Sequence, residues 1–201
     1  MYCEKTQKKY NMNYIEELKN YHPQNEQEEA DKEMILTYIE TFPDTILTRK
    51  NGFAHMTGSS MIFNKKRDKV LMVYHNIYHS WSWTGGHADG DEDMFFVAEK
   101  EAKEETGIKT LRAFSPNSGN SFLAAVDILP VWGHKKRGQY VSSHLHLNFS
   151  YLFEAEEEET LHIKVDENSQ VAWLPIAELK TKVTEPDMIP VYEKLIRLGG
   201  C

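Results

Sequence analysis

The spacing of hydrophobic positions along the chain changes after about residue 44. Before that point, apolar residues repeat at intervals of three and four, which predicts helices over 12–20 and 25–41. Pro43 is expected to end the second helix, because proline lacks the amide hydrogen that a helix interior needs. We therefore expect residues 1–44 to form an N-terminal helical extension.

The main domain, residues 45–201, has short apolar runs separated by polar turns, a pattern typical of strands. The expected strands are 46–48, 54–63, 69–74, 111–114, 122–132, 141–154 and 161–165. A helix is expected at about 93–106, with Gly107 as its left-handed cap. Two further helical segments are expected at 175–179 and 187–198. Many strands with few helices indicate a mixed α/β (α+β) domain.

Composition narrows the class of protein. The 201 residues are 40% hydrophobic and 27% charged, which is ordinary for a globular chain large enough for a real core. The formal net charge of -8 does not attract polyanions, so we expect no long nucleic acid as a partner. No apolar run approaches the roughly 20 residues of a membrane helix, and we expect a cytoplasmic protein without a membrane partner.

Three glutamates of the expected helix at 93–106 indicate its chemistry. Glu101, Glu104 and Glu105 lie at i, i+3 and i+4 and therefore share one face. Like charges at this spacing repel one another, and a hard divalent cation such as Mg²⁺ offsets that cost because it prefers oxygen ligands. For an isolated segment of this kind, a solvated acidic face is the more common interpretation.

The surrounding residues change that interpretation, because their spacing is also fixed. Gly86 is followed by Glu92 after five residues and by Lys100 after seven more. The next positions in register are Glu101, Ala102, Glu104, Glu105, Gly107 and Ile108. This segment resembles the Nudix box of the MutT-like Nudix hydrolases. The resemblance covers about residues 45–200 and implies an α/β/α sandwich with a mixed β-sheet.

The resemblance also implies roles for individual residues. Glu104 and Glu105 correspond to the principal metal ligands, and Glu101 to a further ligand or to the base on the attacking water. The Gly85 carbonyl corresponds to a backbone ligand, and Glu92 to an orienting partner of Lys100. Family members often add an acid from a late loop. The candidates here are Glu157, Glu158, Glu159, Asp166 and Glu167, and the sequence does not choose among them.

The implied reaction is metal-dependent hydrolysis of a nucleoside diphosphate linked to another moiety, with Mg²⁺, or Mn²⁺, as cofactor. Water attacks one phosphorus, and charge neutralisation supplies most of the catalysis. The implied partner is a small nucleotide-type molecule, and a homodimer is expected from relatives.

One position departs from the family pattern, and two alternatives follow. Lys100 stands where the family usually has arginine, so the planar two-pronged hydrogen bond is lost. This favours, as an alternative, a Nudix-like sensor that binds a nucleotide or nucleotide-sugar without cleaving it. An isomerase of the isopentenyl-diphosphate type would need a cysteine near mid-chain, whereas Cys3 and Cys201 lie near the ends.

Several residues outside the box are candidate substrate contacts: Trp83, His87, Lys135, Arg137, His144 and His146. Trp83 could stack on a base, although core packing is the more common use of tryptophan. His144 and His146 alternate on an expected strand, so both imidazoles should share one face. A zinc site would need a third ligand, which the neighbouring sequence does not offer, and substrate-facing or hydrogen-bonded histidines are the favoured interpretation.

Overall fold

The centre of the molecule is a pair of long parallel strands, β1 (Ala54–Asn64) and β9 (His144–Ala155). They pair in unbroken register from Ala54 opposite Leu145 to Asn64 opposite Ala155. The computed structural model describes residues 13–116, 121–136 and 138–201, and within these ranges an eight-stranded sheet forms around this pair. The other pairings are antiparallel, so the sheet is mixed, as expected from the sequence.

The remaining elements follow from the same alternation of apolar runs and turns. The other strands of the sheet are β2 (Lys69–His75), β3 (Ser80–Ser82), β4 (Thr84–His87), β5 (Arg112–Phe114), β6 (Leu123–Val131) and β10 (Asn168–Pro175). A separate hairpin consists of β7 (His134–Lys136) and β8 (Gln139–Val141). The helices are α1 (Tyr14–Asn20), α2 (Glu26–Thr41), α3 (Met94–Thr106), α4 (Leu179–Lys182) and α5 (Ile189–Leu198), with 3₁₀ turns at Ile176–Glu178 and Pro186–Met188.

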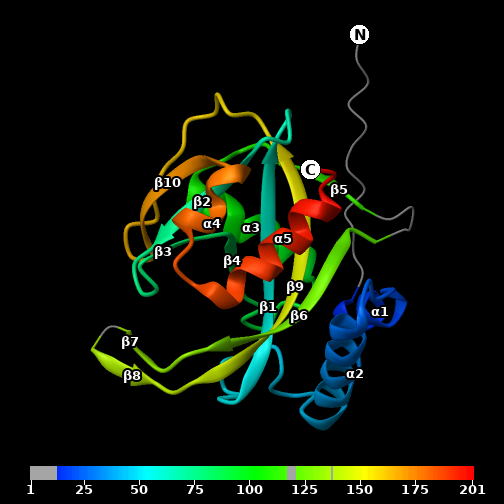
Figure 1. The fold of residues 1–201 in the computed structure, drawn as a ribbon. Helices are drawn as coiled ribbons and strands as arrows, with labels where there is room; N and C mark the ends of the chain where they lie inside the picture. Colours follow the sequence, from blue (N-terminus) through cyan, green and yellow to red (C-terminus); the bar gives the residue numbers. More distant parts are fainter. Residues whose placement is uncertain (1–12, 117–120, 137) are drawn as a thin grey trace.

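Helices cover both faces of the central strands (Figure 1), which confirms the predicted sandwich. On one face, α3 approaches β1 so closely that a Cβ on Gly58 would lie 2.7 Å from the Met94 carbonyl oxygen. On the other face, Tyr192 and Leu195 of α5 belong to a core cluster with Phe63 and Leu152 of the sheet. Two apolar layers therefore enclose the sheet, and both bury side chains away from water.

The N-terminal extension adds its own apolar residues to the layer that contains α3. Leu18 of α1 and Ile35 of α2 are fully buried there. The buried carboxylate of Glu17 accepts hydrogen bonds from the Tyr151 hydroxyl at 2.6 Å and from the Ser121 hydroxyl at 2.8 Å. The described part of the extension therefore packs against the main domain and shares the core layer that contains α3.

Two predicted strands are wrong, and the short strands β3, β4 and β7 and the longer β10 were not predicted. Residues 46–48 form turns whose amides bond locally, as Ile46 N does to Phe42 O. Residues 161–165 form no strand, and the apolar side chains of Ile163 and Val165 are exposed. The sheet edge is instead β10, a half-buried strand that pairs with β2.

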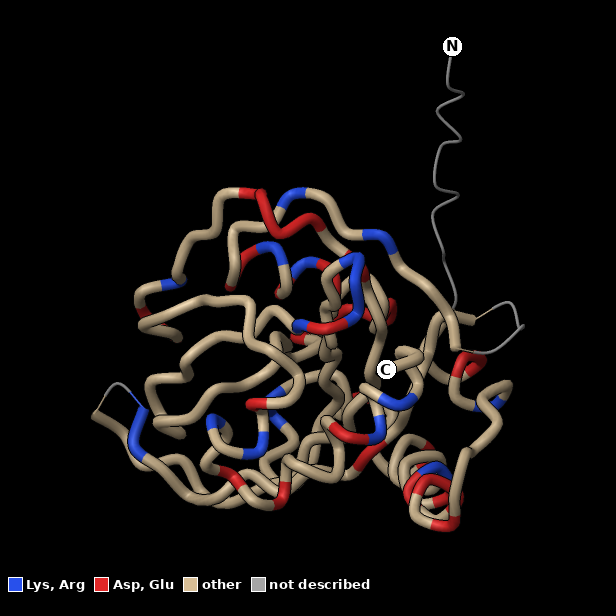
Figure 2. Tube along the Cα trace, turned by 45° about the horizontal axis from the view of Figure 1, so that its top comes forward, with Lys and Arg blue, Asp and Glu red and all other residues tan. Residues whose placement is uncertain are grey.

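Charged residues of both signs are interspersed along the described chain (Figure 2). Among the described helices, none is long and apolar enough to cross a membrane.

Candidate metal and substrate site

Helix α3 is fixed at both ends by side-chain and backbone signals in its own sequence. The Asp93 side chain accepts a hydrogen bond from Phe96 N at its start, and Gly107 takes a left-handed conformation with φ 75° at its end. Val97, Ala98 and Ala102 are buried against the sheet. This anchoring places Glu101 and Glu105 on the flank of the helix that faces β4.

A carboxylate cluster forms where α3 meets β4 and the loop before β10. Oxygen atoms of Glu101, Glu105 and Glu167 lie within 4.8 Å of one another. Glu167 is brought there by its neighbours: Asn168 donates a side-chain hydrogen bond to the Glu105 carbonyl at 3.1 Å, and Asn76 N donates to the Glu167 carbonyl at 3.0 Å. We call these three residues the carboxylate cluster.

The two glycines of β4 let the backbone come close to these carboxylates. A Cβ on Gly86 would lie 2.5 Å from Cγ and Cδ of Glu101, and one on Gly85 would lie 2.4 Å from the Ser59 hydroxyl. The Gly85 amide also donates a hydrogen bond to the Glu105 carboxylate. Any side chain at Gly86 would therefore displace Glu101.

Lys164 lies among the acids. Its Nζ is 3.0 Å from Glu167, 3.4 Å from Glu104 and 3.5 Å from Glu101. Burial alone would lower the pKa of Lys164, but the hydrogen bond with Glu167 and the charges of Glu101 and Glu104 raise it overall. The ammonium group therefore stays charged and offsets part of the mutual repulsion.

Glu105 is the most constrained member of the cluster. Burial, followed by the charges of Glu101 and Glu167, raises its pKa well above the usual range of a carboxyl group. Its Oε2 is buried without a hydrogen-bond partner among the described residues. An orphaned buried oxygen beside two more carboxylates fits a hard divalent cation, since Mg²⁺ prefers oxygen ligands and would restore the missing interaction.

The other predicted residues of the box lie at the margin of the cluster. The Glu104 side chain is 45% exposed and contacts Lys164 and, at 3.9 Å, Lys100. The Glu92 carboxylate accepts a hydrogen bond from the Asn13 side chain at 2.7 Å. The structure thus brings Glu101 and Glu105 together, while Glu104 lies outside the group that shares one ion-sized space.

Of the five late-loop acids, Glu167 lies in the cluster. Glu157 pairs with Lys69 at 2.6 Å, and Glu159 accepts hydrogen bonds from the amides of Lys109 and Thr110. Glu158 and Asp166 are exposed. Sequence reasoning could name the candidates only, because the contact depends on how the loop docks on the end of α3.

The candidate substrate residues fall into three groups. Trp83 is buried and packs edge-on against Tyr192 at 5.4 Å, whereas Lys135 is exposed on β7. Arg137 lies outside the described residues. His87, His144 and His146 lie together with His55, a residue that the sequence analysis passed over.

Comparison with known proteins identifies the family of this chain. A family model described as NUDIX domain matches residues 54–195. The chain therefore belongs to the NUDIX family, and the enzyme class that this family defines is that of the Nudix hydrolases.

Solved structures share the fold. One is an Ap4A hydrolase from C. elegans in a binary complex, with 18% identity and a TM-score of 0.52, covering 73% of this chain and 98% of that chain. Another is the Nudix hydrolase RenU from M. smegmatis, with 12% identity and a TM-score of 0.51, covering 74% of this chain and 88% of that chain. No curated protein matches the sequence.

Proposed function

We propose that the protein hydrolyses the diphosphate bond of a small nucleoside-diphosphate-type molecule with the help of Mg²⁺ or Mn²⁺. The observation that carries the proposal is the convergence of Glu101, Glu105 and Glu167, together with the orphaned Glu105 oxygen. A divalent cation bound there would neutralise phosphate charge and lower the pKa of a bound water. The interspersed charges and acidic balance favour a small substrate over long nucleic acid.

Individual residues suit different roles in this reaction, as metal ligands or as the acceptor of the proton from water. Glu105 and Glu167 are fixed by their hydrogen bonds with the backbone and the β10 loop, so they suit the role of ligands. Glu101 lies beside Gly86 and is reachable from the cluster edge, so it suits either a further ligand or the group that accepts the proton of the attacking water. Glu104, Lys100 and the Gly85 carbonyl stay candidates for assisting roles.

A substrate screen with the metal varied tests the proposal. The full chain is incubated with Ap4A, nucleotide-sugars and nucleoside triphosphates, each with Mg²⁺, with Mn²⁺, or with a chelator. We expect monophosphate-containing products from at least one compound in the presence of metal and none with the chelator. Hydrolysis that is equally fast with the chelator would overturn the metal requirement.

The second candidate function is a nucleotide sensor without turnover. Lys100 favours it, because among the described residues its ammonium makes a long ion pair with Glu104 at 3.9 Å, while Glu92 accepts a hydrogen bond from Asn13 instead. Calorimetry with the same compounds separates the two candidates, since tight binding without product formation would indicate the sensor. Light scattering of the same sample tests the expected homodimer.

A further inference from the structure

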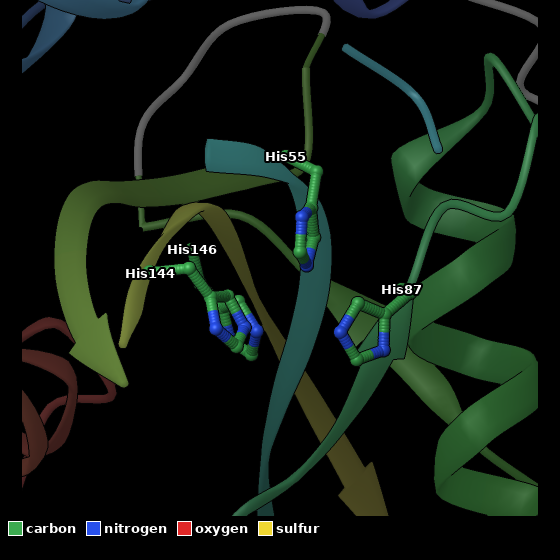
Figure 3. A group of neighbouring side chains, drawn as sticks. All are labelled: His55, His87, His144 and His146. Atoms are coloured by element: carbon green, nitrogen blue, oxygen red, sulfur yellow. The ribbon is translucent and has the colours of Figure 1, made fainter. Parts of the chain in front are cut away.

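Four histidines from three strands meet at one end of the central strands. They are His55 of β1, His87 of β4, and His144 and His146 of β9. We call these residues the histidine cluster. One ring nitrogen from each lies within 4.8 Å of the other three, and Figure 3 shows the rings grouped around a common space.

Strand register explains why these residues meet. His55 is the direct partner of His146 in the parallel β1–β9 pair. His144 lies two residues before His146 and therefore on the same face. His87 is opposite Thr57, two residues after His55, which places it diagonally across from His55 on that face. The arrangement is thus set by the rigid centre of the sheet.

Hydrogen bonds fix which nitrogen of two of these rings carries the proton. His55 Nδ1 lies 3.0 Å from the Asn51 carbonyl, and His144 Nδ1 lies 2.9 Å from the Ser142 carbonyl. Because a carbonyl oxygen only accepts, both Nδ1 atoms carry the hydrogen, so in the neutral form of either ring the lone pair is on Nε2. A carbonyl that orients a ring in this way is the usual outer partner of a metal-bound histidine.

Two Nε2 atoms of the cluster, those of His55 and His146, have no hydrogen-bond partner within the described ranges. His55 is 4% exposed, and its Nε2 is buried without a hydrogen bond among the described residues. The Nε2 of His146 is also buried and unpartnered there. A buried polar nitrogen without a hydrogen-bond partner costs roughly 1–3 kcal/mol, so two such atoms in one cluster call for a ligand.

The charge state of the rings permits metal binding, because imidazole binds a metal ion in its neutral form. Burial, with the neighbouring cationic and imidazole groups, lowers the pKa of His87 to about 3 and also lowers those of His55 and His146. A neutral imidazole has one N–H donor and one nitrogen with a lone pair, so each of these three rings can offer a lone pair to a metal ion at neutral pH. Arg49 and Lys136 contribute to these lowered pKa values, so cationic groups lie near the cluster, and zinc binding depends on the lone pairs rather than on negative charge.

We propose that the histidine cluster is a binding site for a transition-metal ion, and specifically for Zn²⁺. Imidazole nitrogen suits zinc better than Mg²⁺, which prefers oxygen. A tetrahedral zinc with bonds of about 2.1 Å separates its ligands by about 3.4 Å, so the cluster needs to contract only modestly. Four protein ligands leave no open position, which is typical of a structural site that here ties β1, β4 and β9 together.

The site is distinct from the carboxylate cluster. Alternation along β4 directs Gly86 toward Glu101 and α3, and the next residue, His87, toward the opposite face. The two clusters therefore differ in face, in ligand type and in the metal that they favour. Failure of the zinc proposal would leave the hydrolase proposal untouched, and the converse also holds.

The test measures zinc binding by the full chain after chelator treatment, with Mg²⁺ in excess to occupy the carboxylate cluster. We expect one Zn²⁺ per chain to survive dialysis, an increase in melting temperature with zinc, and, with Co²⁺, the visible absorption of a tetrahedral site. His144→Ala and His55→Asn should weaken zinc binding by more than about 100-fold, given that outer partners alone are worth about 10–100-fold.

Two matched variants complete the experiment. His22→Ala removes an exposed histidine that is not part of the histidine cluster, and this variant should bind zinc as the unaltered protein does. Glu105→Gln removes a carboxylate ligand candidate and should also keep the zinc. His144→Ala serves if His55→Asn fails to fold, because His144 is only partly buried. Equal zinc affinity in the unaltered protein and in His144→Ala would overturn the proposal, as would loss of zinc in Glu105→Gln.

Discussion

The carboxylate cluster and the histidine cluster lie on opposite faces of β4, and they differ in charge and in the type of metal ligand that they offer. The carboxylate cluster gathers negative charge and offsets part of it with Lys164. In the histidine cluster, burial lowers the pKa of His55, His87 and His146, and the Nε2 atoms of His55 and His146 are buried without hydrogen-bond partners among the described residues. The first arrangement suits a hard ion that exchanges with substrate, and the second a softer ion that stays bound.

The two clusters also show which side chains lower the stability of the folded protein. Each cluster buries polar atoms without partners, which costs free energy in the metal-free protein. In both clusters this free-energy cost is confined to a few side chains on a well-packed sheet. Substitutions at these side chains should therefore separate function from folding, and the largest separation is expected at Glu105.

Glu105→Gln should produce the largest effect. It removes the central carboxylate charge but keeps the size of the side chain, so we expect hydrolysis to fall by about 10³-fold, the order of loss seen when a main electrostatic group is removed. The raised pKa of Glu105 means that its charged form opposes folding, and that penalty grows as pH rises above the ordinary carboxyl range. The melting temperature at neutral pH should therefore stay the same or increase.

Glu104→Gln is the matched control for this prediction. The half-exposed Glu104 lies outside the carboxylate cluster, so its loss should reduce turnover by only about 10-fold or less. Losses of equal size in the two variants would contradict the geometry and support the equal ranking of Glu104 and Glu105 that the Nudix-box resemblance implies. Both measurements use the substrate found in the screen, with steady-state kinetics and thermal melting.

The contiguous part of the site was predictable from sequence, and the part assembled from distant segments was not. Glu101 and Glu105 lie one helical turn apart, so helix geometry brings them together, and Gly86 was recognised from its fixed spacing to them. Glu167 and His55 reach their clusters through tertiary packing, by the docking of a loop and by strand register. No local pattern encodes either contact.

The same distinction explains the errors in the predicted strands. The long runs of β1 and β9 are apolar enough to be recognised from sequence, and both were expected. Ile46 is fully buried in a turn, because an apolar residue signals burial and not the backbone conformation that achieves it. β10 begins with polar residues and is half-buried, so its strand character depends on its partner β2.

Gly86→Ala tests how closely β4 must approach the carboxylate cluster. The added methyl group would meet Glu101 at 2.5 Å, and a side chain yields more readily than backbone, so the carboxylate should move while the fold persists. We expect kcat/KM to fall by about 10–100-fold, the range found when a supporting contact of a metal site is lost. Gly52→Ala is the control, because a Cβ there meets nothing within 4 Å. Unchanged kinetics in Gly86→Ala would show that Glu101 needs no fixed position.

Lys164→Met should give the smallest effect, and its sign is informative. The Lys164 ammonium contacts the carboxylates of Glu101, Glu104 and Glu167, so in the metal-free protein it competes with a cation for the same charges. Its removal should destabilise the metal-free protein by about 1 kcal/mol, since these partly exposed pairs are screened by solvent. It should also tighten Mg²⁺ binding by a few-fold.

Urea unfolding with and without Mg²⁺ measures the change in stability, and calorimetric titration measures the Mg²⁺ affinity. Lys164→Arg provides a charge-preserving control. If Mg²⁺ binding tightens in the methionine variant alone, Lys164 acts as a built-in counter-ion that the metal displaces. If Mg²⁺ binding is unchanged but KM rises, the ammonium instead contacts substrate phosphate and stays in place when metal binds. Lys164 makes its ion pairs with Glu101, Glu104 and Glu167, so neither variant should alter zinc affinity at the histidine cluster.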